Sequence, residues 1–311
     1  MQASASTQHV RRHPAARSRR RAAVILLVPF FAMFVGFFVA PIGYAVYQSL
    51  FRVHLSETLG IGGGQTTVFA GLQNYTRSFA DARFVASVGR IVLFAVVEVP
   101  VMIFFAVILG LLLDSASARW PGFFRSAFFA PYGVPGVIAS LMWGFLYLPS
   151  LSPVVDILGW FGLHPDFLGS GLTLWSIANI VTWSFAGYNV LVVTAQLKSI
   201  SPDLIESATI DGAGQWKIAR YVKLPLARPA IILATVFTII GSLQLFAEPL
   251  VLQLIDNHVS PTYTPNLSAY NEAFQYNDYN YAAAQSVIVA VLAMILSFAF
   301  LKFTQRNGSD A

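Results

Sequence analysis

The residue patterns that most clearly indicate covalent chemistry are missing from this 311-residue chain. The chain has no cysteine, which excludes disulfides, thiolate metal sites and cysteine catalysis. Of five histidines, only His9 and His13 have the spacing of two ligands on one helical face, and Pro14 follows them with no third ligand nearby. No GxxxxGK[ST] segment is present to cradle a phosphate. We therefore expect no catalytic residue, metal site or cofactor in this chain, and any nucleotide energy must come from another chain.

The most polar stretch between the apolar segments is residues 201–229, SPDLIESATIDGAGQWKIARYVKLPLARP. A serine cap, a proline at the first helical position and early acidic residues predict a helix that starts after Ser201. Asp211-Gly212 then predicts a turn. A second, amphipathic helix is expected to end before the Leu-Pro pair at 224–225. Its basic face would carry Lys217, Arg220 and Lys223. The stretch is thus predicted to be a polar helical hairpin.

The rest of the chain is mostly apolar. Hydrophobic residues make up 56% of the sequence and charged residues 11%, and the mean hydropathy is +0.65. This is far more apolar surface than a soluble core of this size needs, so the chain is predicted to be an integral membrane protein. The net charge of +5 requires no acidic partner, because the basic residues sort by membrane side.

Six segments are long and apolar enough to cross a bilayer, which takes about 20 residues per helix. They cover residues 22–50, 87–113, 126–148, 172–197, 230–252 and 282–303. The first is too long for the core of a cleavable signal peptide and is expected to stay as a signal anchor. Pro131 and Pro135 interrupt the third and predict a kink or local unwinding. The predicted fold class is all-α, a polytopic membrane protein with six transmembrane helices and the hairpin between the fourth and fifth.

The distribution of lysine and arginine predicts the orientation. Fifteen of the 19 lie in the amino-terminal arm, the loop after the second span, the hairpin or the carboxyl end. The other four are Arg52, Arg77, Arg83 and Arg90. Because cytoplasmic loops are rich in these residues, we place both termini and the hairpin in the cytoplasm.

The sequence divides into three parts. Residues 1–21 form a basic arm held at the anionic cytoplasmic face of the membrane. A nucleic-acid-binding arm would have a similar composition, but this basic run leads directly into a hydrophobic span. Residues 22–305 form the transmembrane domain, and residues 306–311 form a cytoplasmic tail.

The hairpin carries the most specific motif. Glu206-Ser207-Ala208, then Gly212, then the segment 222–225 (VKLP) resemble the EAA motif of binding-protein-dependent ABC importer permeases. The family pattern is EAA, three residues, Gly, nine residues and I-x-L-P, and the serine and the valine are small departures from it. Further segments are similar to the carbohydrate branch of that family, which includes maltose and glycerol-phosphate permeases. These are Ile210 to Ala213 with Trp216, the Pro131 and Pro135 pair followed by Trp143, and Tyr281 to Ala284.

The resemblance implies a permease subunit that moves a sugar or related polyol inward through the cell membrane of a prokaryote. It implies four kinds of partner: a second permease subunit, two ATPase subunits that bind ATP and Mg, an extracytoplasmic solute-binding protein and membrane lipid. No nucleic acid is implied. The hairpin would be a coupling helix that seats in a cleft of the ATPase. The residues so assigned are Glu206, Ser207, Ala208, Asp211, Gly212, Leu224 and Pro225.

Each coupling residue also has a purely structural interpretation. Glu206 would contact a basic residue of the ATPase, or it would interact with the helix dipole. Gly212 would permit the sharp turn. Asp211 would form a contact or only the turn itself. Trp216 would pack within the hairpin or contact the ATPase. The basic face would be solvated or would meet lipid headgroups.

A sugar needs hydrogen-bonding groups and aromatic faces, so its path should appear as polar residues within the spans. In the fourth span, three polar residues spaced seven apart share one helical face. Tyr188 lies beside the middle one, and Thr238 and Ser242 enrich the fifth span. The substrate-path candidates are Thr182, Tyr188, Asn189, Gln196 and Gln244. The alternative for each is a hydrogen bond between helices.

Glu98 is the one acidic residue deep within a span. Such a carboxylate is either a proton site or a hydrogen-bonded helix contact, and the lack of a chain of other ionisable groups favours the contact. Glu248, near the outer end of the fifth span, is expected to reach water. Two other functions stay open: an ion-coupled secondary transporter, which would require Glu98, and a membrane scaffold with no role in transport.

Overall fold

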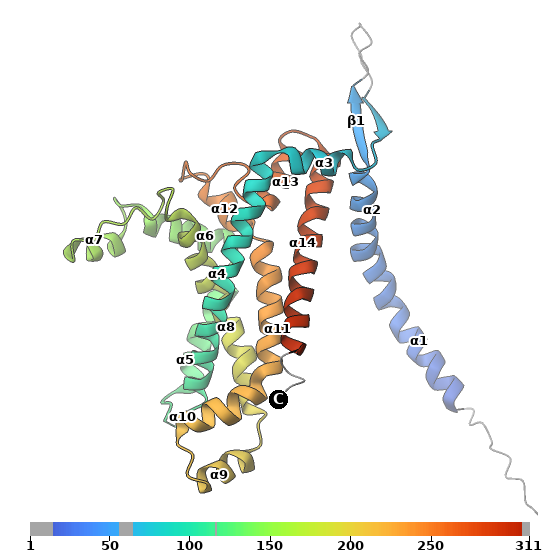
Figure 1. The fold of residues 1–311 in the computed structure, drawn as a ribbon. Coiled ribbons are helices and arrows are strands. Elements are labelled where there is room, and N and C mark those ends of the chain that lie inside the picture. The colour runs from blue at the N-terminus through green and yellow to red at the C-terminus, as the bar shows by residue number, and fades with distance from the viewer. Residues whose placement is uncertain (1–14, 56–64, 116, 307–311) are drawn as a thin grey trace, which may run out of the picture.

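The computed structural model describes residues 15–55, 65–115 and 117–306, and most of them lie in a bundle of long helices (Figure 1). The long helices and the short elements continuous with them are α1 (Ala15–Phe34), η1 (Val35–Val39), α2 (Ala40–Ser49), α4 (Ala82–Leu113), α5 (Pro121–Phe129), η2 (Ala130–Gly133), α6 (Gly136–Tyr147), α8 (Thr173–Lys198), α11 (Leu224–Leu243) and α14 (Tyr279–Arg306). The shorter ones are β1 (Phe51–Leu55), β2 (Gln65–Phe69), α3 (Gln73–Ala80), α7 (Pro153–Trp160), α9 (Pro202–Ile210), α10 (Gln215–Ile218), η3 (Ala219–Lys223), α12 (Ala247–Leu252) and α13 (Pro265–Phe274).

The prediction of a polytopic helical membrane protein is confirmed. In the described ranges, five helices are long and apolar enough to cross a membrane, or six if the bent pair formed by residues 121–133 and 136–147 counts as one span. The small exception to an all-α fold is the antiparallel pair β1 and β2, in which Phe51 faces Phe69 and Leu55 faces Gln65. The basic arm is partly described: α1 already begins at Ala15, inside the segment 1–21 assigned to that arm.

The two ends of the bundle carry different segments. The hairpin of α9 and α10 and the carboxyl end of α14 share one end, which we call the hairpin end (Figure 1). The strands, α3 and α13 share the other, which we call the strand end (Figure 1). Segments placed on one side by their lysine and arginine content thus lie at one end of the molecule.

The third span is broken at its prolines, as predicted. Its two helical parts, residues 121–133 and 136–147, meet at an angle of 98°. Val134 between them is extended (φ −84°, ψ 124°). The reason is steric, because the ring of Pro135 clashes with an α-helical conformation at the residue before it.

The fifth span differs from its prediction at both ends. The helix does not stop before Pro225 but runs from Gln215 through η3 into α11. It then ends at Leu243, inside the segment 230–252 that was predicted to be continuous, and restarts as α12. The first difference has a local cause: η3 is a π-helix, whose wider turn accommodates the missing backbone N–H and the ring of the proline that follows. The same pairing occurs in the first span, where the π-helix η1 precedes Pro41.

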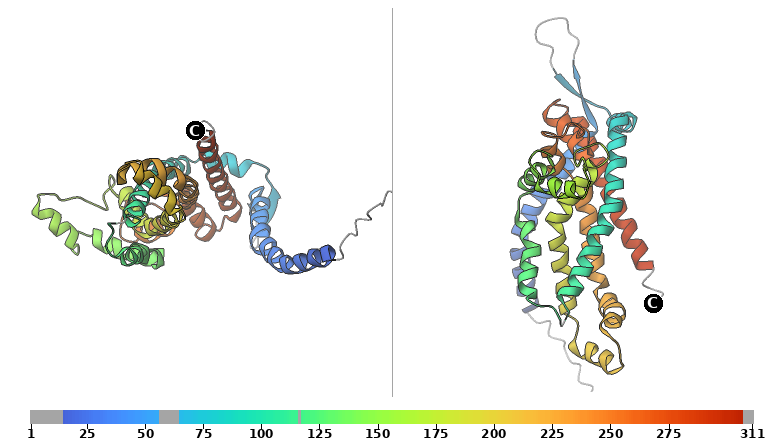
Figure 2. Two further views of the ribbon diagram at one scale, coloured as in Figure 1. Left: turned by 90° about the horizontal axis from the view of Figure 1, so that it is seen from below. Right: turned by 90° about the vertical axis from the view of Figure 1, so that its left-hand side faces the viewer.

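The core lies between α4 and α8, which pack along their lengths. The fully buried side chains there include Phe84, Ile91, Phe94, Met102, Ile177 and Ile180. By contrast, none of the apolar window of the first span is buried, and α1 projects from the bundle on the side opposite α7 (Figure 2). Its apolar surface is therefore left for lipid or another chain.

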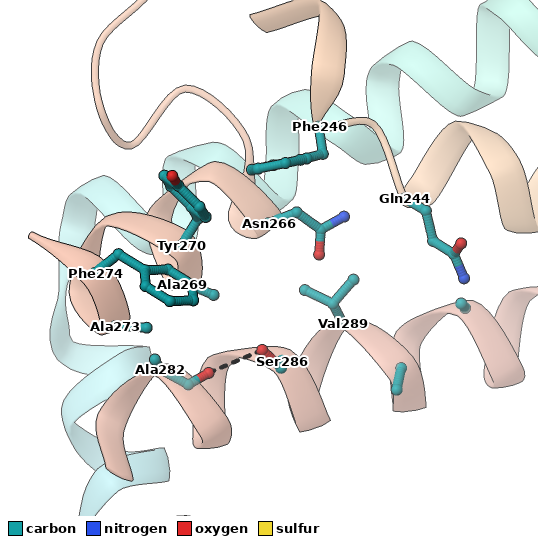
Figure 3. Close-up of a pocket in the computed structure, with 12 residues that line it drawn as sticks. Gln244, Phe246, Asn266, Ala269, Tyr270, Ala273, Phe274, Ala282, Ser286 and Val289 are labelled. Atoms are coloured by element: carbon teal, nitrogen blue, oxygen red, sulfur yellow. Dashed lines mark hydrogen bonds between the residues drawn. The ribbon is translucent and has the colours of Figure 1, made fainter. Parts of the chain in front are cut away.

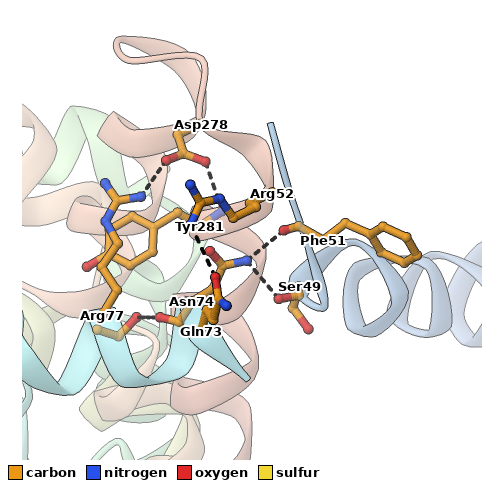
Figure 4. Close-up of polar contacts among 9 residues, drawn as sticks. Ser49, Phe51, Arg52, Gln73, Asn74, Arg77, Asp278 and Tyr281 are labelled. Atoms are coloured by element: carbon orange, nitrogen blue, oxygen red, sulfur yellow. Dashed lines mark hydrogen bonds and ion pairs between the residues drawn. The ribbon is translucent and has the colours of Figure 1, made fainter. Parts of the chain in front are cut away.

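Asn74 joins the first span to the bundle at the strand end. Its buried amide donates to the carbonyl oxygens of Ser49 (2.9 Å) and Phe51 (2.7 Å) (Figure 4). Nearby, Arg77 forms an ion pair of 2.7 Å with Asp278 and lies over the ring of Tyr281 (Figure 4). These contacts hold α3 between the end of α2 and the start of α14.

The substitution Asn74→Asp tests this connection. It removes both N–H donors and places a carboxylate against two carbonyl oxygens, so we expect it to cost about 1–3 kcal/mol of stability or more. The measurement is the thermal unfolding midpoint of the purified chain in detergent. Gln73→Glu makes the same chemical change at an exposed neighbour that accepts from Arg52, and it should leave the midpoint nearly unchanged. Equal midpoints for the two variants would contradict the assignment.

Candidate functional site

A cavity of about 600 Å³ lies where the broken third span meets α8 and α11. Both helix breaks border it, because Gly136 follows one break and Gln244, Leu245 and Phe246 form the other. The remaining lining residues are Met102, Tyr132, Val181, Phe185, Tyr188, Asn189, Phe237, Thr238, Gly241, Ser242, Ala247 and Glu248. The lining combines amides, hydroxyls and aromatic rings in an otherwise apolar part of the molecule.

The polar part of the lining is centred on Asn189, which is almost fully buried. Its amide donates to the hydroxyl of Thr238 (3.1 Å) and to the sulfur of Met102 (3.0 Å). Its carbonyl oxygen has no hydrogen-bond partner among the described residues. The oxygen itself is enclosed, so the contacts of this amide join α8 to α11 and α4 at the wall of the cavity.

Glu98 lies behind this surface rather than on it. Its carboxylate accepts a hydrogen bond of 2.7 Å from the hydroxyl of Ser242, which does line the cavity. The geometry matches the hydrogen-bonded helix contact, one of the two interpretations of this residue. Glu248, which was expected to reach water, is instead buried and lines the cavity, because α12 packs against α6.

Aromatic rings form the other part of the lining. The rings of Tyr132 and Tyr188 stack with 5.3 Å between centroids and 21° between planes. Phe185 meets Tyr132 edge to face, with 5.8 Å between centroids. Tyr132 belongs to η2 and the other two to α8, so the stack depends on how closely the third span approaches α8.

Gly187 permits that approach. A Cβ built on it would lie 1.8 Å from the carbonyl oxygen of Phe128 and 2.9 Å from the Cα of Phe129. Only a residue without a side chain fits where the backbones come this close. This contact positions the neighbouring Tyr188 against Tyr132.

The predicted path residues separate into two groups. Tyr188, Asn189 and Gln244 line the cavity, together with the two hydroxyl residues noted in the fifth span. Thr182 and Gln196 lie outside the lining, and the amide of Gln196 points toward the carbonyl of Leu226 (3.4 Å). Spacing by seven aligns residues along one helix, but α8 is adjacent to different elements at different heights.

Three aromatic lining residues were not predicted from the sequence: Tyr132, Phe185 and Phe237. The only signal for any of them was the proline pair beside Tyr132.

A second cavity of about 510 Å³ adjoins the first, because Gln244 and Phe246 line both (Figure 3). It lies between α13 and α14. On one side the rings of Phe246, Tyr270 and Phe274 follow one another at 5.2 and 4.9 Å (Figure 3). Asn266 and Gln244 bring amides to the same space. The second cavity thus continues the combination of amides and aromatic rings toward the strand end.

The hairpin has the turn that its sequence predicts. Gly212 adopts φ +79°, a left-handed conformation that favours glycine. Ser201 precedes α9, but its side chain makes no capping hydrogen bond, contrary to expectation. Of the residues assigned to coupling, Glu206, Ser207, Asp211, Gly212 and Pro225 are exposed, and Ala208 and Leu224 are half-buried. Among the described residues Glu206 takes part in no ion pair.

Large apolar side chains are also exposed on the hairpin. Ile210 is 86% exposed and Trp216 75%, and Leu204 and Tyr221 are exposed as well. Packing within the hairpin therefore does not account for Trp216. Leaving such side chains in water is unfavourable by about 25 cal/mol per Å², and exposed apolar surface of this kind is typical of sites that contact another protein or a membrane.

The predicted basic face is wrong at Lys223. This side chain is buried and forms an ion pair of 2.7 Å with Asp114, the residue that ends α4. The π-turn of η3 contributes to this, because a wider turn rotates the residues after it away from the face set by Lys217 and Arg220. The base of the hairpin is thereby attached to the second span.

Most of the chain is similar to known transport proteins. Residues 79–307 match the family described as binding-protein-dependent transport system inner membrane component. The chain is 29% identical to the lactose transport system permease protein LacF of Rhizobium radiobacter, over 88% of this chain and 91% of the relative. It is 28% identical to the sulfoquinovosyl glycerol transport system permease protein SmoG of Agrobacterium fabrum, over 93% and 92%.

A solved structure has a similar fold. It is the crystal structure of a bacterial alginate ABC transporter in complex with an alginate pentasaccharide-bound periplasmic protein, and one of its chains matches with a TM-score of 0.77 and 19% identity. The match covers 94% of this chain and 96% of the other. At this identity the likeness establishes the fold.

The substitution Gly187→Ala tests the close approach of α8 to the third span. The added methyl group overlaps backbone atoms that cannot rotate away, so we expect a loss of about 1–3 kcal/mol or more, seen as a lower unfolding midpoint in detergent. Gly241→Ala is the matched control, since it lines the same cavity and its added Cβ meets nothing within 4 Å. A control that destabilises as much as Gly187→Ala would refute the explanation.

A charge-reversal series tests the ion pair at the base of the hairpin. Lys223→Met leaves the Asp114 carboxylate almost buried without its partner, and the expected cost is roughly 3 kcal/mol. Asp114→Asn should cost a similar amount. The double variant Lys223→Asp with Asp114→Lys should recover part of the unfolding midpoint. Additive costs in the double variant Lys223→Met with Asp114→Asn would show that the two groups do not interact.

Proposed function

The chain belongs to the family of binding-protein-dependent transport system inner membrane components, and on this basis we propose that it is the permease subunit of an ATP-driven importer of a sugar or related polyol. The observation that carries the proposal is the cavity at the two helix breaks. Its volume of about 600 Å³ is in the usual range of small-molecule sites, about 300–1,000 Å³.

The chemistry of the cavity supports a sugar as the substrate. A sugar ring has hydroxyl groups that exchange hydrogen bonds and C–H faces that pack on aromatic rings. Thr238 and Gln244 supply the first kind of contact, and the stacked rings of Tyr132 and Tyr188 supply the second. The names of the two relatives, which transport lactose and sulfoquinovosyl glycerol, agree with this class. We assign Thr182 and Gln196 no direct substrate contact.

The hairpin is the proposed coupling element. Glu206 is exposed without an ionic partner, and the exposed Ile210 and Trp216 lie on the same hairpin. This combination fits a cleft in a partner that offers a basic residue and apolar contacts. Two ATPase subunits that bind ATP and Mg are the proposed partners, and this chain has no ATPase site of its own. As the ATPase subunits close, the hairpin moves, and Lys223 transmits that motion to α4 through Asp114.

The other partners occupy the remaining surfaces. The unburied first span offers a second permease subunit an apolar helix to pack against. At the strand end, α3, α13 and the strands are where an extracytoplasmic solute-binding protein would dock. We propose that the hairpin end faces the cytoplasm of a prokaryote, the side to which the lysine and arginine distribution also assigns both termini.

Sugar-dependent ATP hydrolysis and sugar uptake in proteoliposomes of the assembled transporter test the proposal. Gly212→Pro is expected to uncouple the two activities, because proline cannot adopt φ +79°. Gly214→Ala is the matched control, with an ordinary φ of −70° and open space around its Cβ. Glu206→Ala should weaken binding of the ATPase subunits.

Substitutions in the cavity should have a different effect. Tyr188→Ala, which removes a direct contact, and Asn189→Ala, which removes hydrogen bonds between the lining helices, should lower sugar uptake at least about tenfold, while the basal ATP hydrolysis remains. If only Glu98→Gln abolished uptake, and uptake followed an ion gradient without ATP, the chain would be a secondary transporter. Unchanged uptake after loss of the chain would indicate a scaffold.

A further inference from the structure

A third cavity, of about 560 Å³, lies at the strand end and shares no lining residue with the two described above. It is formed by the first turns of α4, the start of α8 and the segment 256–263. Its polar lining includes Arg90, His258 and Tyr263, and Gly89, Leu93 and Trp175 contribute apolar surface. Its occupant is therefore expected to have both a polar and an apolar part.

Arg90 is held in place by contacts that leave its charge uncompensated. Its guanidinium donates to the carbonyl oxygen of Tyr263 (2.6 Å) and lies over the ring of the same residue, 4.4 Å from the centroid. None of the ion pairs in the described part of the chain includes it. A guanidinium has five N–H groups, so donors remain for a ligand in the cavity.

A buried acid bonded to two of the lining residues is already engaged. Asp256 accepts hydrogen bonds from the hydroxyl of Thr173 (2.8 Å) and from the backbone N–H of His258 (2.7 Å). The imidazole of His258 lies 3.1 Å from the same carboxylate and is half exposed toward the cavity. Asp256 is not among the lining residues, so the lining presents Arg90 without a carboxylate.

The depth of the cavity matches that of lipid headgroups. The α4 helix has 32 residues and is about 48 Å long, whereas a bilayer core is about 30 Å thick. Counted from its charged end at Asp114, about 20 residues of α4 cross the core, which places Arg90 about 6 Å beyond it. Trp175, on α8, lies at the same end, and tryptophan is enriched at this level of the membrane.

An apolar stripe continues from the cavity along α4 into the membrane. Leu93, Val97, Val101 and Phe104 recur at helical spacing and are all exposed. An acyl chain can lie on such a stripe while its headgroup enters the cavity. This continuity distinguishes a lipid from a free anion.

We propose that this cavity binds the phosphodiester of an anionic phospholipid, with Arg90 as the anion-binding residue and the stripe from Leu93 to Phe104 as the path of an acyl chain. Phosphatidylglycerol fits this chemistry. The choline of phosphatidylcholine would place another positive charge next to the guanidinium of Arg90, near His258. This makes the zwitterionic lipid the weaker ligand. The proposal does not depend on what the protein transports.

Native mass spectrometry of the full chain, titrated with phosphatidylglycerol or phosphatidylcholine, tests the proposal. Arg90→Gln should weaken phosphatidylglycerol binding at least about tenfold, the loss of a charge-assisted contact. Arg90→Lys should retain part of it. Arg83→Gln is the matched control: it removes one positive charge from the same end of α4, is mostly exposed, and does not line the cavity, so it should bind as the wild type does.

Gly89→Leu provides a variant that keeps Arg90. A Cβ at Gly89 meets nothing within 4 Å, so the leucine side chain enters the open cavity without displacing the protein. The unfolding midpoint in lipid-free detergent should stay the same while phosphatidylglycerol binding falls. This separates loss of the site from loss of the fold.

Four results would overturn the proposal. The first is wild-type affinity in both Arg90→Gln and Gly89→Leu. The second is an equal loss in Arg83→Gln, which would mean that only surface charge matters. The third is displacement of the lipid by millimolar inorganic phosphate, which would indicate a free-anion site. The fourth is loss of lipid binding on assembly with the second permease, which would make the cavity a subunit contact.

Discussion

A bilayer core offers no hydrogen bonds to an interrupted helix, and this constraint organises the centre of the molecule. Backbone that leaves the helical conformation within a membrane is tolerated only where protein buries it or where it lines a cavity. Both breaks in this chain, at Val134-Pro135 and at Gln244 to Phe246, border the same cavity. The cavity and the helix breaks therefore depend on each other: the breaks form part of its lining, and the cavity is where interrupted backbone is tolerated.

The cavity also depends on a close contact between backbones. Gly187 brings α8 against the end of α5, and this approach stacks Tyr188 on Tyr132. Hydrogen bonds from Asn189 to Thr238 and from Ser242 to Glu98 join α8, α11 and α4 behind the lining. The polar groups in the spans thus serve two purposes: some face the cavity, and others, such as Glu98, position the helices that form it.

Two direct connections link a displacement of the hairpin to this cavity. Lys223 attaches the base of the hairpin to the end of α4, and α11 continues from the hairpin without interruption to the break at Gln244. A displacement of the hairpin therefore acts on two helices that line the cavity. The π-turn of η3 lies between α10 and α11, and such turns often mark functional positions in helices.

Local sequence determined much of this protein, because local rules apply within a single helix. Apolar length marked the spans, prolines marked the break in the third, and Asp211-Gly212 marked the turn of the hairpin. The motif around Glu206 was sufficient to indicate the family. Tertiary structure alone decided which helices meet. Lys223 forms its ion pair with Asp114, which is 109 residues away in the sequence. Asn189 lines the cavity, whereas Thr182 and Gln196 do not. Spacing along one helix sets a face, but the neighbour of that face at each height follows from breaks, π-turns and backbone contacts that involve several helices at once.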